Sequence, residues 1–414
     1  MTDIAGTVPV IAVDKVQAVA LAVCTYYFGV WIKGKVGVLS RYSIPSPVVG
    51  GMSFAIVVSF LEYFNIVKVQ IDSTLQTVLM LGFFTTIGLM ASLRVVKDGG
   101  RLLLGFLLAV TVLVFLQNGM GMAIAEAMGF DKHYGILAGS VSMMGGLGTA
   151  AAFGPYFEET YGITGGTAVA VTAATFGMVA ALLIGGPFGE WCIRRYQVKT
   201  PDEVQQPEPE LHLPDDMDTD ITEQHASAKP NFTNEIMRAV SVTALAMGLG
   251  TIVSNYLGHY ITLPAYIGAM IVATVIRNVG DFSGMYKVEG KGLNAVADIT
   301  LVLFVTMAIN NLKLHELVHL ALPLVVILAC QTILMLIYAW TVLFTAFGRS
   351  YDAVMLSVGG IGFSMGATAN GLANMQAISE KYGSSPRAWL IVSVVGAFLI
   401  DLINAVVITW FGTL

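Results

Sequence analysis

Long apolar segments dominate this sequence and constrain the fold more than any other feature. A bilayer core of about 30 Å needs roughly 20 apolar residues for each helix that spans it. Apolar residues make up 56% of the 414 positions and charged residues only 12%, against roughly 25% charged in a soluble domain. The sequence therefore predicts an all-α polytopic membrane protein. The ten predicted spans are 15–33, 45–62, 74–92, 103–127, 165–190, 237–257, 263–280, 294–312, 320–347 and 388–412.

Two further apolar stretches, at 135–153 and 353–376, are interrupted by glycine and polar residues and do not form complete spans. Lipid cannot satisfy the N–H and C=O groups of irregular backbone, so such a segment must be buried in protein or line a wet cavity. We therefore expect each stretch to form a re-entrant hairpin inside the protein.

The distribution of lysine and arginine predicts the orientation, because these residues accumulate in cytoplasmic loops. With the N-terminus placed outside, all but four of the 21 basic residues fall on the inner side of the predicted spans. The four exceptions are Lys15, Lys68, Lys132 and Lys313. We expect both termini outside and the polar segment between the two halves in the cytoplasm.

The two halves of the chain resemble each other, which indicates an internal duplication. The segment GGLGTAAAFGPYFEETYG at 145–162 aligns without a gap with GATANGLANMQAISEKYG at 366–383, and Gln117 in VFLQNG matches Gln331 in LACQTI. Interruptions at corresponding points of two halves are the best sequence indication of a transporter's substrate site.

Five spans per half predict that the second half has the opposite orientation in the membrane. We therefore predict two inverted repeats, at 1–197 and 234–414, each with five transmembrane helices and one re-entrant hairpin. The segment 198–233 between them is poor in apolar residues and rich in proline and acid. Such a composition predicts a solvated cytoplasmic linker.

The first break also contains a G-x-G-x-x-A pattern, from Gly146 to Ala151. In dinucleotide-binding proteins this motif follows a strand in a βαβ unit, and the corresponding position in the second half lacks the pattern. We therefore reject nucleotide binding.

Glycines at the breaks predict a ligand site instead. They let the backbone reverse and let a ligand approach it, and a helix that begins after the reversal offers free N–H groups to a carboxylate. Close helix packing by small residues is the alternative, but two breaks in symmetric positions favour a site. The predicted substrate contacts in this group are Gly145, Gly146, Gly148, Thr149 and Gly366.

Polar side chains complete the predicted substrate site. Thr368, Asn370 and Asn374 offer hydroxyl and amide groups at the second break. Asp401 lies near the centre of the last span, where a carboxylate is costly and functional by default. It can coordinate sodium or hold a substrate ammonium group; a structural hydrogen bond to a neighbouring helix is the alternative.

Oxygen-bearing side chains near the midplane are the predicted sodium ligands. Asp401 and Asn404 lie one turn apart, and Thr175 lies in the corresponding helix of the first half. Asn310 lies toward the outer end of the eighth span. A hydrogen bond within its own helix is the alternative for Thr175, and a helix cap is the alternative for Asn310.

Two other classes of membrane protein compete with a carrier. A membrane-embedded enzyme would use Asp401 as acid or base, but the sequence lacks a nucleophile, paired carboxylate or metal cluster to act with it. An uncoupled channel is the other alternative. An enzyme alters its ligand, whereas a carrier returns it unchanged and saturates. We expect a carrier, and we expect no nucleic-acid partner.

Six motifs occur in fixed order along the chain: IPSPVVGG (44–51), TTIGL (85–89), LAGSVSMMGGLGTAAAF (137–153), ATFGMVAALLIGGP (174–187), YDAVMLSVGGIGFSMGATANGLANMQAISEKYG (351–383) and VGAFLIDLINAVVI (395–408). Together they resemble the bacterial sodium/glutamate symporter family over nearly the whole chain outside the linker and the extreme N-terminus. The resemblance implies electrogenic uptake of L-glutamate with sodium (Na+) as the coupling ion, across the bacterial inner membrane. It also implies a homodimer in which a mobile core carrying both hairpins moves against a scaffold of the other helices.

The chain departs from the family motifs at both breaks. Family members similar to the best-known one read GGHGT where this chain has Leu147, and GATPTAIANM where Ala369 and Asn370 stand in place of Pro-Thr. Another small carboxylate or amino acid is therefore the alternative substrate.

Overall fold

The computed structural model describes residues 9–41, 44–94, 100–201, 232–257, 265–284, 286, 290–314 and 320–414. Most of the predicted linker lies outside these ranges. The described chain is mainly helical, and the predicted all-α membrane class is confirmed. One short parallel sheet pairs β1 (Val10–Val13) with β2 (Lys68–Ile71).

The described residues of the first half form eight α-helices and one π-helical segment. They are α1 (Lys15–Lys35), α2 (Gly37–Arg41), α3 (Ser46–Tyr63), α4 (Thr74–Met90), α6 (Gly100–Ala127), α7 (Lys132–Ile136), η1 (Leu137–Val141), α8 (Gly146–Tyr161) and α9 (Gly166–Tyr196). The second half follows the same order of long and broken helices. Its elements are α10 (Phe232–Leu257), α11 (Ala265–Ser283), α12 (Lys291–Asn310), α13 (Ala321–Tyr338), η3 (Ala339–Ala346), α14 (Tyr351–Ser364), α15 (Thr368–Tyr382), α16 (Pro386–Val394), η4 (Val395–Leu399) and α17 (Ile400–Gly412).

Eight helices of the described chain are long and apolar enough to cross a membrane, and they coincide with eight of the predicted spans. The remaining two predicted spans correspond to α4 and α11. α4 is apolar but has only 17 residues. α11 has 19 residues and carries Arg277, Asn278 and Asp281 in its last two turns.

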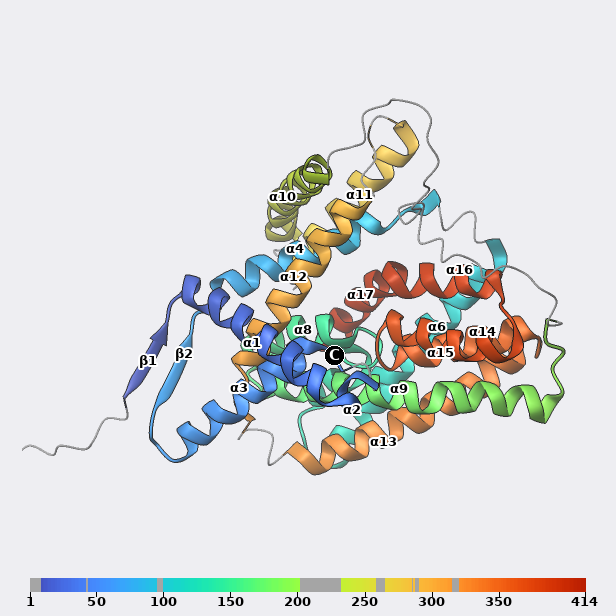
Figure 1. Cartoon of the computed structure of the whole chain (residues 1–414), viewed down its shortest axis with the longest axis horizontal. Coiled ribbons are helices and arrows are strands. Elements are labelled where there is room, and N and C mark those ends of the chain that lie inside the picture. Colours follow the sequence, from blue (N-terminus) through green and yellow to red (C-terminus); the bar gives the residue numbers. More distant parts are fainter. Residues whose placement is uncertain are drawn as a thin grey trace, which may run out of the picture.

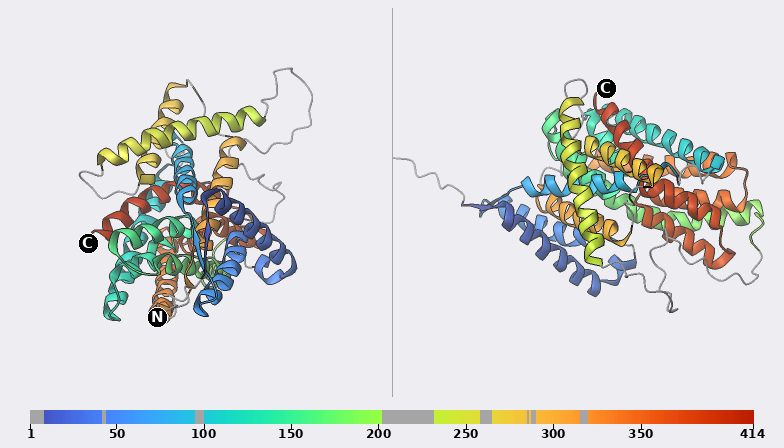
Figure 2. Two further views of the ribbon diagram at one scale, coloured as in Figure 1. Left: turned by 90° about the vertical axis from the view of Figure 1, so that its left-hand side faces the viewer. Right: turned by 90° about the horizontal axis from the view of Figure 1, so that it is seen from above.

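The helices are arranged in two bundles (Figures 1 and 2). The peripheral bundle contains α1, α3 and α4 from the first half and α10, α11 and α12 from the second. The central bundle contains α6 to α9 from the first half and α13 to α17 from the second. Each half thus supplies three helices to the peripheral bundle and a broken helix pair with two long helices to the central bundle.

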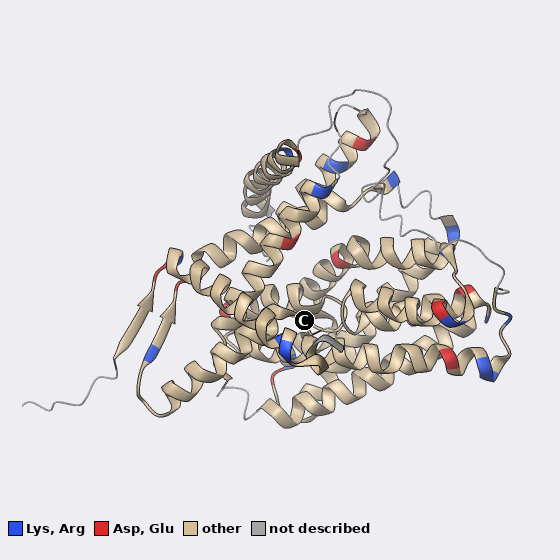
Figure 3. Cartoon of the chain, viewed as in Figure 1, with Lys and Arg blue, Asp and Glu red and all other residues tan. Residues whose placement is uncertain are grey.

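Burial differs between the bundles. Only 22% of the apolar window of α1 and of α10 is buried, against 61% for α9 and for the α16–α17 helix. The main hydrophobic core lies in the central bundle and extends to α3, α4 and α12. Charged residues lie mostly near helix ends and connections, and few fall in the middle of the helices (Figure 3). The α9 and α16–α17 helices of the central bundle are therefore the most buried of the long apolar helices in the described chain.

Local sequence signals start and end the helices around the breaks. The Ser350 hydroxyl accepts a hydrogen bond from the Ala353 N–H at the start of α14 (3.2 Å), and Ser385 caps α16 just before Pro386. Gly162, with φ of +69°, ends α8 in the left-handed conformation, which glycine adopts without steric cost. These caps hold the helices of both broken pairs in place.

Candidate functional site

The first break joins η1 to α8 through a tight turn. The turn closes through hydrogen bonds from the Met144 and Gly145 N–H groups to the Ser140 carbonyl, at 3.2 and 3.0 Å. Gly146 then begins α8 with φ of +62°, a conformation that costs other residues about 1–2 kcal/mol. The positive φ therefore explains why glycine occupies this position.

The second break separates α14 from α15. α14 ends at Ser364, and α15 begins at Thr368 after Ala367, whose backbone is extended. The N–H groups of Asn370 and Gly371 return to the Ala367 carbonyl at 2.9 and 3.2 Å. Both predicted interruptions are thus real breaks between helices.

The two breaks meet in the centre of the molecule. A Cβ added at Gly146 would lie 2.6 Å from the Gly366 carbonyl oxygen, closer than side-chain carbons approach oxygen. Both breaks also pack on the middle of α9. A Cβ at Gly177 would overlap the Met365 carbonyl oxygen, and a Cβ at Gly366 would lie 3.1 Å from the Met178 Cα. Glycine makes this close backbone contact possible.

The first turns of α8 and α15 carry the free donors of the site. No described residue accepts a hydrogen bond from the N–H groups of Leu147 and Gly148, nor from those of Thr368 and Ala369. Such groups sit at the positive ends of helix dipoles and favour carboxylates. Because Gly146 faces Gly366, the two helix N-termini are neighbours, and together they suit an acidic ligand.

The first break also contacts the peripheral bundle. A Cβ at Gly148 would lie 3.0 Å from the Phe83 ring of α4 and 3.4 Å from a Leu301 methyl of α12. Thr149 is buried and packs its side chain against Gly145. All four predicted site residues of this break are therefore brought together, at the boundary between the bundles.

The polar residues of the second break bind neighbouring backbone carbonyls. The Thr368 hydroxyl donates to the Gly396 carbonyl of η4 at 2.5 Å. The Asn370 amide donates to Met178 O at 2.8 Å, and the Asn374 amide donates to Ala181 O at 3.0 Å, both on α9. These bonds hold α15 against the centre of α9. The exposed pair of Lys381 Nζ and Glu190 Oε1, at 2.7 Å, ties the far end of α15 to α9 and raises the pKa of Lys381.

Alanine at Gly185 is expected to destabilise the protein, although alanine is the better helix former. Its Cβ would overlap the Asn374 amide. Loss of the hydrogen bond to Ala181 in a membrane interior costs about 0.6–1.7 kcal/mol. A lower Tm of the purified protein checks this expectation.

The adjacent Gly186→Ala variant is the matched control, because nothing lies within 4 Å of a Cβ at Gly186. Its stability is expected to stay unchanged or to rise by up to about 1 kcal/mol from helix propensity. Equal Tm values for the Gly185 and Gly186 variants would contradict the packing role of Asn374.

The predicted sodium ligands lie in different places. Asn404 on α17 is buried and donates to the Ser140 carbonyl, beside the first break, at 3.1 Å. Asp401 lies one turn earlier and is partly exposed, and no described residue forms a hydrogen bond or ion pair with its carboxylate. The Thr175 hydroxyl bonds to Val171 O of its own helix at 2.8 Å. This arrangement brings Asn404 to the breaks.

Asn310 lies away from the breaks, in the peripheral bundle. Its amide donates to the Thr25 hydroxyl of α1 at 3.1 Å, and its Oδ1 has no partner among the described residues. The structure does not bring this residue together with the other predicted sodium ligands.

Sequence reasoning assigned no chemistry to a set of buried polar side chains between the breaks and α6. They are Gln117, Asn118, Ser140, Gln331 and Ser364, each at most 1% exposed. The signal was present, because polar residues inside apolar spans are costly and functional by default. Even the correspondence of the two glutamines between the halves was visible.

Comparison with known proteins gives consistent matches. A family model described as sodium/glutamate symporter matches residues 11–384. The sodium/glutamate symporter of Escherichia coli (strain K12) is 37% identical over 400 residues, covering 95% of this chain and 96% of the relative. The sodium/glutamate symporter of Haemophilus influenzae is 34% identical over 395 residues, covering 94% and 95%.

Proposed function

The chain belongs to the sodium/glutamate symporter family, and from this premise we propose how its structure performs sodium-coupled uptake of L-glutamate. Membership makes it a multi-pass membrane transporter with sodium as the coupling ion, and not an enzyme. The proposal concerns the site, the repeat organisation and the orientation.

The meeting of the two breaks is the observation that supports the substrate site. Two helix N-termini with free N–H groups lie side by side where Gly146 faces Gly366. Glutamate carries two carboxylates, and each N-terminus suits one of them. The ligands are Gly145, Gly146, Gly148 and Thr149 from the first break, with Gly366, Thr368, Asn370 and Asn374 from the second.

The arrangement of the bundles supports an inverted duplication of 1–197 and 234–414, joined by the linker 198–233. Each half supplies three helices to the peripheral bundle and one broken pair to the central bundle. In this proposal α7–η1 with α8, and α14 with α15, are re-entrant hairpins. The central bundle moves against the peripheral bundle, which forms the scaffold, and Gly148 lies at the sliding contact.

Sodium binds near Asp401 and Asn404 in this scheme, with Thr175 as a further oxygen donor. Asn310 lies in the peripheral bundle, where its amide donates to Thr25, and it is not a ligand of this site. A sodium ion there attracts a carboxylate group of glutamate. Each net charge moved inward gains about 2.3 kcal/mol per 100 mV of membrane potential. Charge movement with sodium therefore drives accumulation.

The orientation and assembly complete the proposal. The chain lies in the bacterial inner membrane as a homodimer, with both termini outside and the linker in the cytoplasm. The exposed apolar side chains of α10, such as Leu245 and Ile252, fit contact with lipid or a second copy.

Uptake of labelled glutamate into proteoliposomes tests the function directly. An inward sodium gradient is expected to drive accumulation above equilibrium, and an interior-negative potential is expected to increase the rate. Replacing external sodium with choline at equal ionic strength is the control. If no acidic substrate accumulates in a sodium-dependent manner, the proposed coupling of uptake to sodium is wrong.

Another small carboxylate is the alternative substrate, because this chain carries Leu147, Ala369 and Asn370 at positions where its family motif differs. The structure uses the Asn370 amide to hold α9. A competition panel of amino acids and dicarboxylates in the uptake assay separates the alternatives, and the strongest competitor identifies the substrate class.

A further inference from the structure

Six buried polar side chains form two hydrogen-bonded sets, which meet where Gln117 and Asn118 are neighbours on α6. We call these six residues the amide cluster. Its members come from α6, η1, α13, the end of α14 and α17, and each is at most 1% exposed. They are Gln117, Asn118, Ser140, Gln331, Ser364 and Asn404. Such a group in an apolar interior needs partners for every donor and acceptor.

The amide nitrogens of the cluster all have backbone acceptors except that of Asn118. Gln117 Nε2 donates to Ser364 O at 2.9 Å, and Gln331 Nε2 donates to Gln117 O at 2.7 Å. Asn404 Nδ2 donates to Ser140 O at 3.1 Å. Because a carbonyl accepts only from the nitrogen of an amide, these bonds also establish which end of each amide is the oxygen.

The oxygens are left without partners. No described protein group donates to Gln117 Oε1, Gln331 Oε1 or Asn404 Oδ1, and the hydroxyls of Ser140 and Ser364 are unpaired. The Asn118 oxygen accepts from the Ser140 N–H at 2.9 Å, and its nitrogen has no acceptor among the described residues. Three amide oxygens and two hydroxyl oxygens of the cluster are therefore left with lone pairs that a ligand can use.

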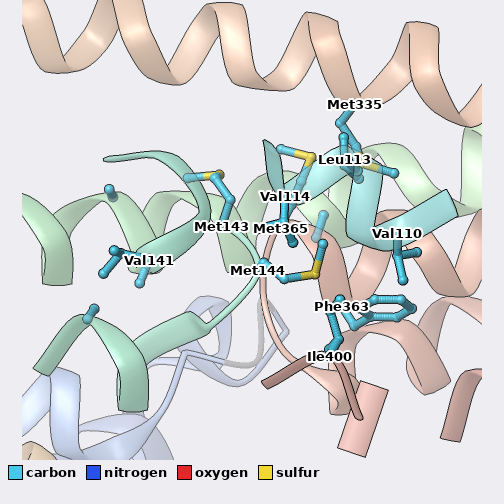
Figure 4. Packing of buried hydrophobic residues seen from close by; sticks show 14 of the residues in the cluster. Val110, Leu113, Val114, Val141, Met143, Met144, Met335, Phe363, Met365 and Ile400 are labelled. Carbon is cyan, nitrogen blue, oxygen red and sulfur yellow. The ribbon is translucent and has the colours of Figure 1, made fainter. Parts of the chain in front are cut away.

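Buried apolar residues lie next to members of the cluster along their helices, and Figure 4 shows how several of these apolar side chains pack. Leu113 and Val114 precede the α6 amides by one turn, Met335 follows Gln331 by one turn, and Met365 follows Ser364 directly. All of these apolar residues are fully buried. A ligand at the cluster is therefore removed from bulk solvent, and the unpaired oxygens must replace its hydration shell.

We propose that the oxygens of the amide cluster bind the coupling sodium ion. Oxygen donors suit a hard cation such as sodium. The inference rests on the proposed function and extends its sodium site, through the shared Asn404, to Gln117, Gln331, Ser140 and Ser364.

The position of the cluster explains coupling to substrate. The Ser140 carbonyl accepts the hydrogen bonds that close the turn of the first break, and Ser364 is the last residue of α14 before the second break. An ion held by both residues fixes the segments that lead into Gly146 and Gly366. Sodium bound here therefore prepares the pair of helix N-termini for glutamate.

Replacement of Ser364 by alanine tests the proposal, with Ser357→Ala as matched control. Both serines are fully buried on α14, but the Ser357 hydroxyl bonds to Ala353 O of its own helix at 2.7 Å. Thermal unfolding of the purified full chain is measured against sodium chloride, with choline chloride keeping ionic strength constant and glutamate absent. Sodium is expected to raise Tm in the wild type and in Ser357→Ala.

The measured quantity is the sodium concentration that gives half of the maximal increase in Tm. In Ser364→Ala this concentration is expected to rise roughly tenfold or more, as metal affinity falls when a residue around a metal site is replaced. Gln331→Met, with Thr332→Val as its control on the same helix, is expected to show the same loss; the Thr332 hydroxyl bonds to Leu328 O at 2.8 Å. Unchanged sodium midpoints in both test variants, with sodium-dependent uptake intact, would overturn the cluster as the ion site. A wild type with neither sodium stabilisation nor sodium-dependent uptake would instead overturn the proposed function.

Discussion

Alanine at Gly146 is expected to reduce glutamate uptake in proteoliposomes by about 100-fold, the cost of displacing a ligand site by about 1 Å. The added Cβ would lie 2.6 Å from Gly366 O, so the two breaks must move apart. The N-termini of α8 and α15 would then be too far apart to bind the same ligand. Initial rates under an inward sodium gradient, with equal amounts of monodisperse protein, measure the loss.

Gly162→Ala is the matched control for the conformational cost. Gly162 has φ of +69°, close to the +62° of Gly146, but nothing lies within 4 Å of its Cβ. Both variants therefore carry a similar backbone penalty of about 1–2 kcal/mol, and only Gly146→Ala disturbs the contact between the breaks. Similar uptake by the two variants would show that this contact does not build the substrate site.

Asn at Asp401 is expected to abolish concentrative uptake while leaving the protein folded. The substitution keeps the size of the side chain and removes the charge from a partly exposed position near the middle of the α16–α17 helix. Loss of a charge that binds a cation costs about 2–5 kcal/mol, which corresponds to at least about 30-fold in affinity. Uptake and sodium-dependent Tm measure the effect.

The control for this charge change is Asp14→Asn. Asp14 caps α1 through bonds to the Val16 and Gln17 N–H groups at 2.8 and 2.9 Å, and asparagine caps helices equally well. Uptake by this variant is expected to equal that of the wild type. Wild-type accumulation by Asp401→Asn would return Asp401 to a structural role.

The membrane class and the positions of the breaks could be predicted because their signals are local. A run of roughly 20 apolar residues predicts a membrane span directly. Eight predicted spans coincide with helices of the described chain that are long and apolar enough to cross a membrane. α4 and α11 were less clear, because one is short and the other carries charged residues near its end. The family followed from ordered motifs, and the comparisons confirm it.

Only part of the candidate site could be predicted from the sequence. Gly146 and Gly366 were recognised separately as glycines in broken spans, but their contact depends on how α8 and α14 pack around α9. Asn370 and Asn374 were recognised as polar groups at the break, whereas their binding to α9 carbonyls depends on which helix lies beside α15. The role of Gln117 likewise depends on neighbours far along the chain.

By itself, the sequence determined the membrane class, the places where the helices break and the family, because each depends on residue type over a short window. Only the tertiary structure decided that the breaks meet, that Asn310 belongs to the peripheral bundle, and that Gln117 and Gln331 leave buried oxygens without donors. The physical reason is that hydrogen-bond partners and close contacts are set by which helices are neighbours. A single sequence carries no distance between its helices.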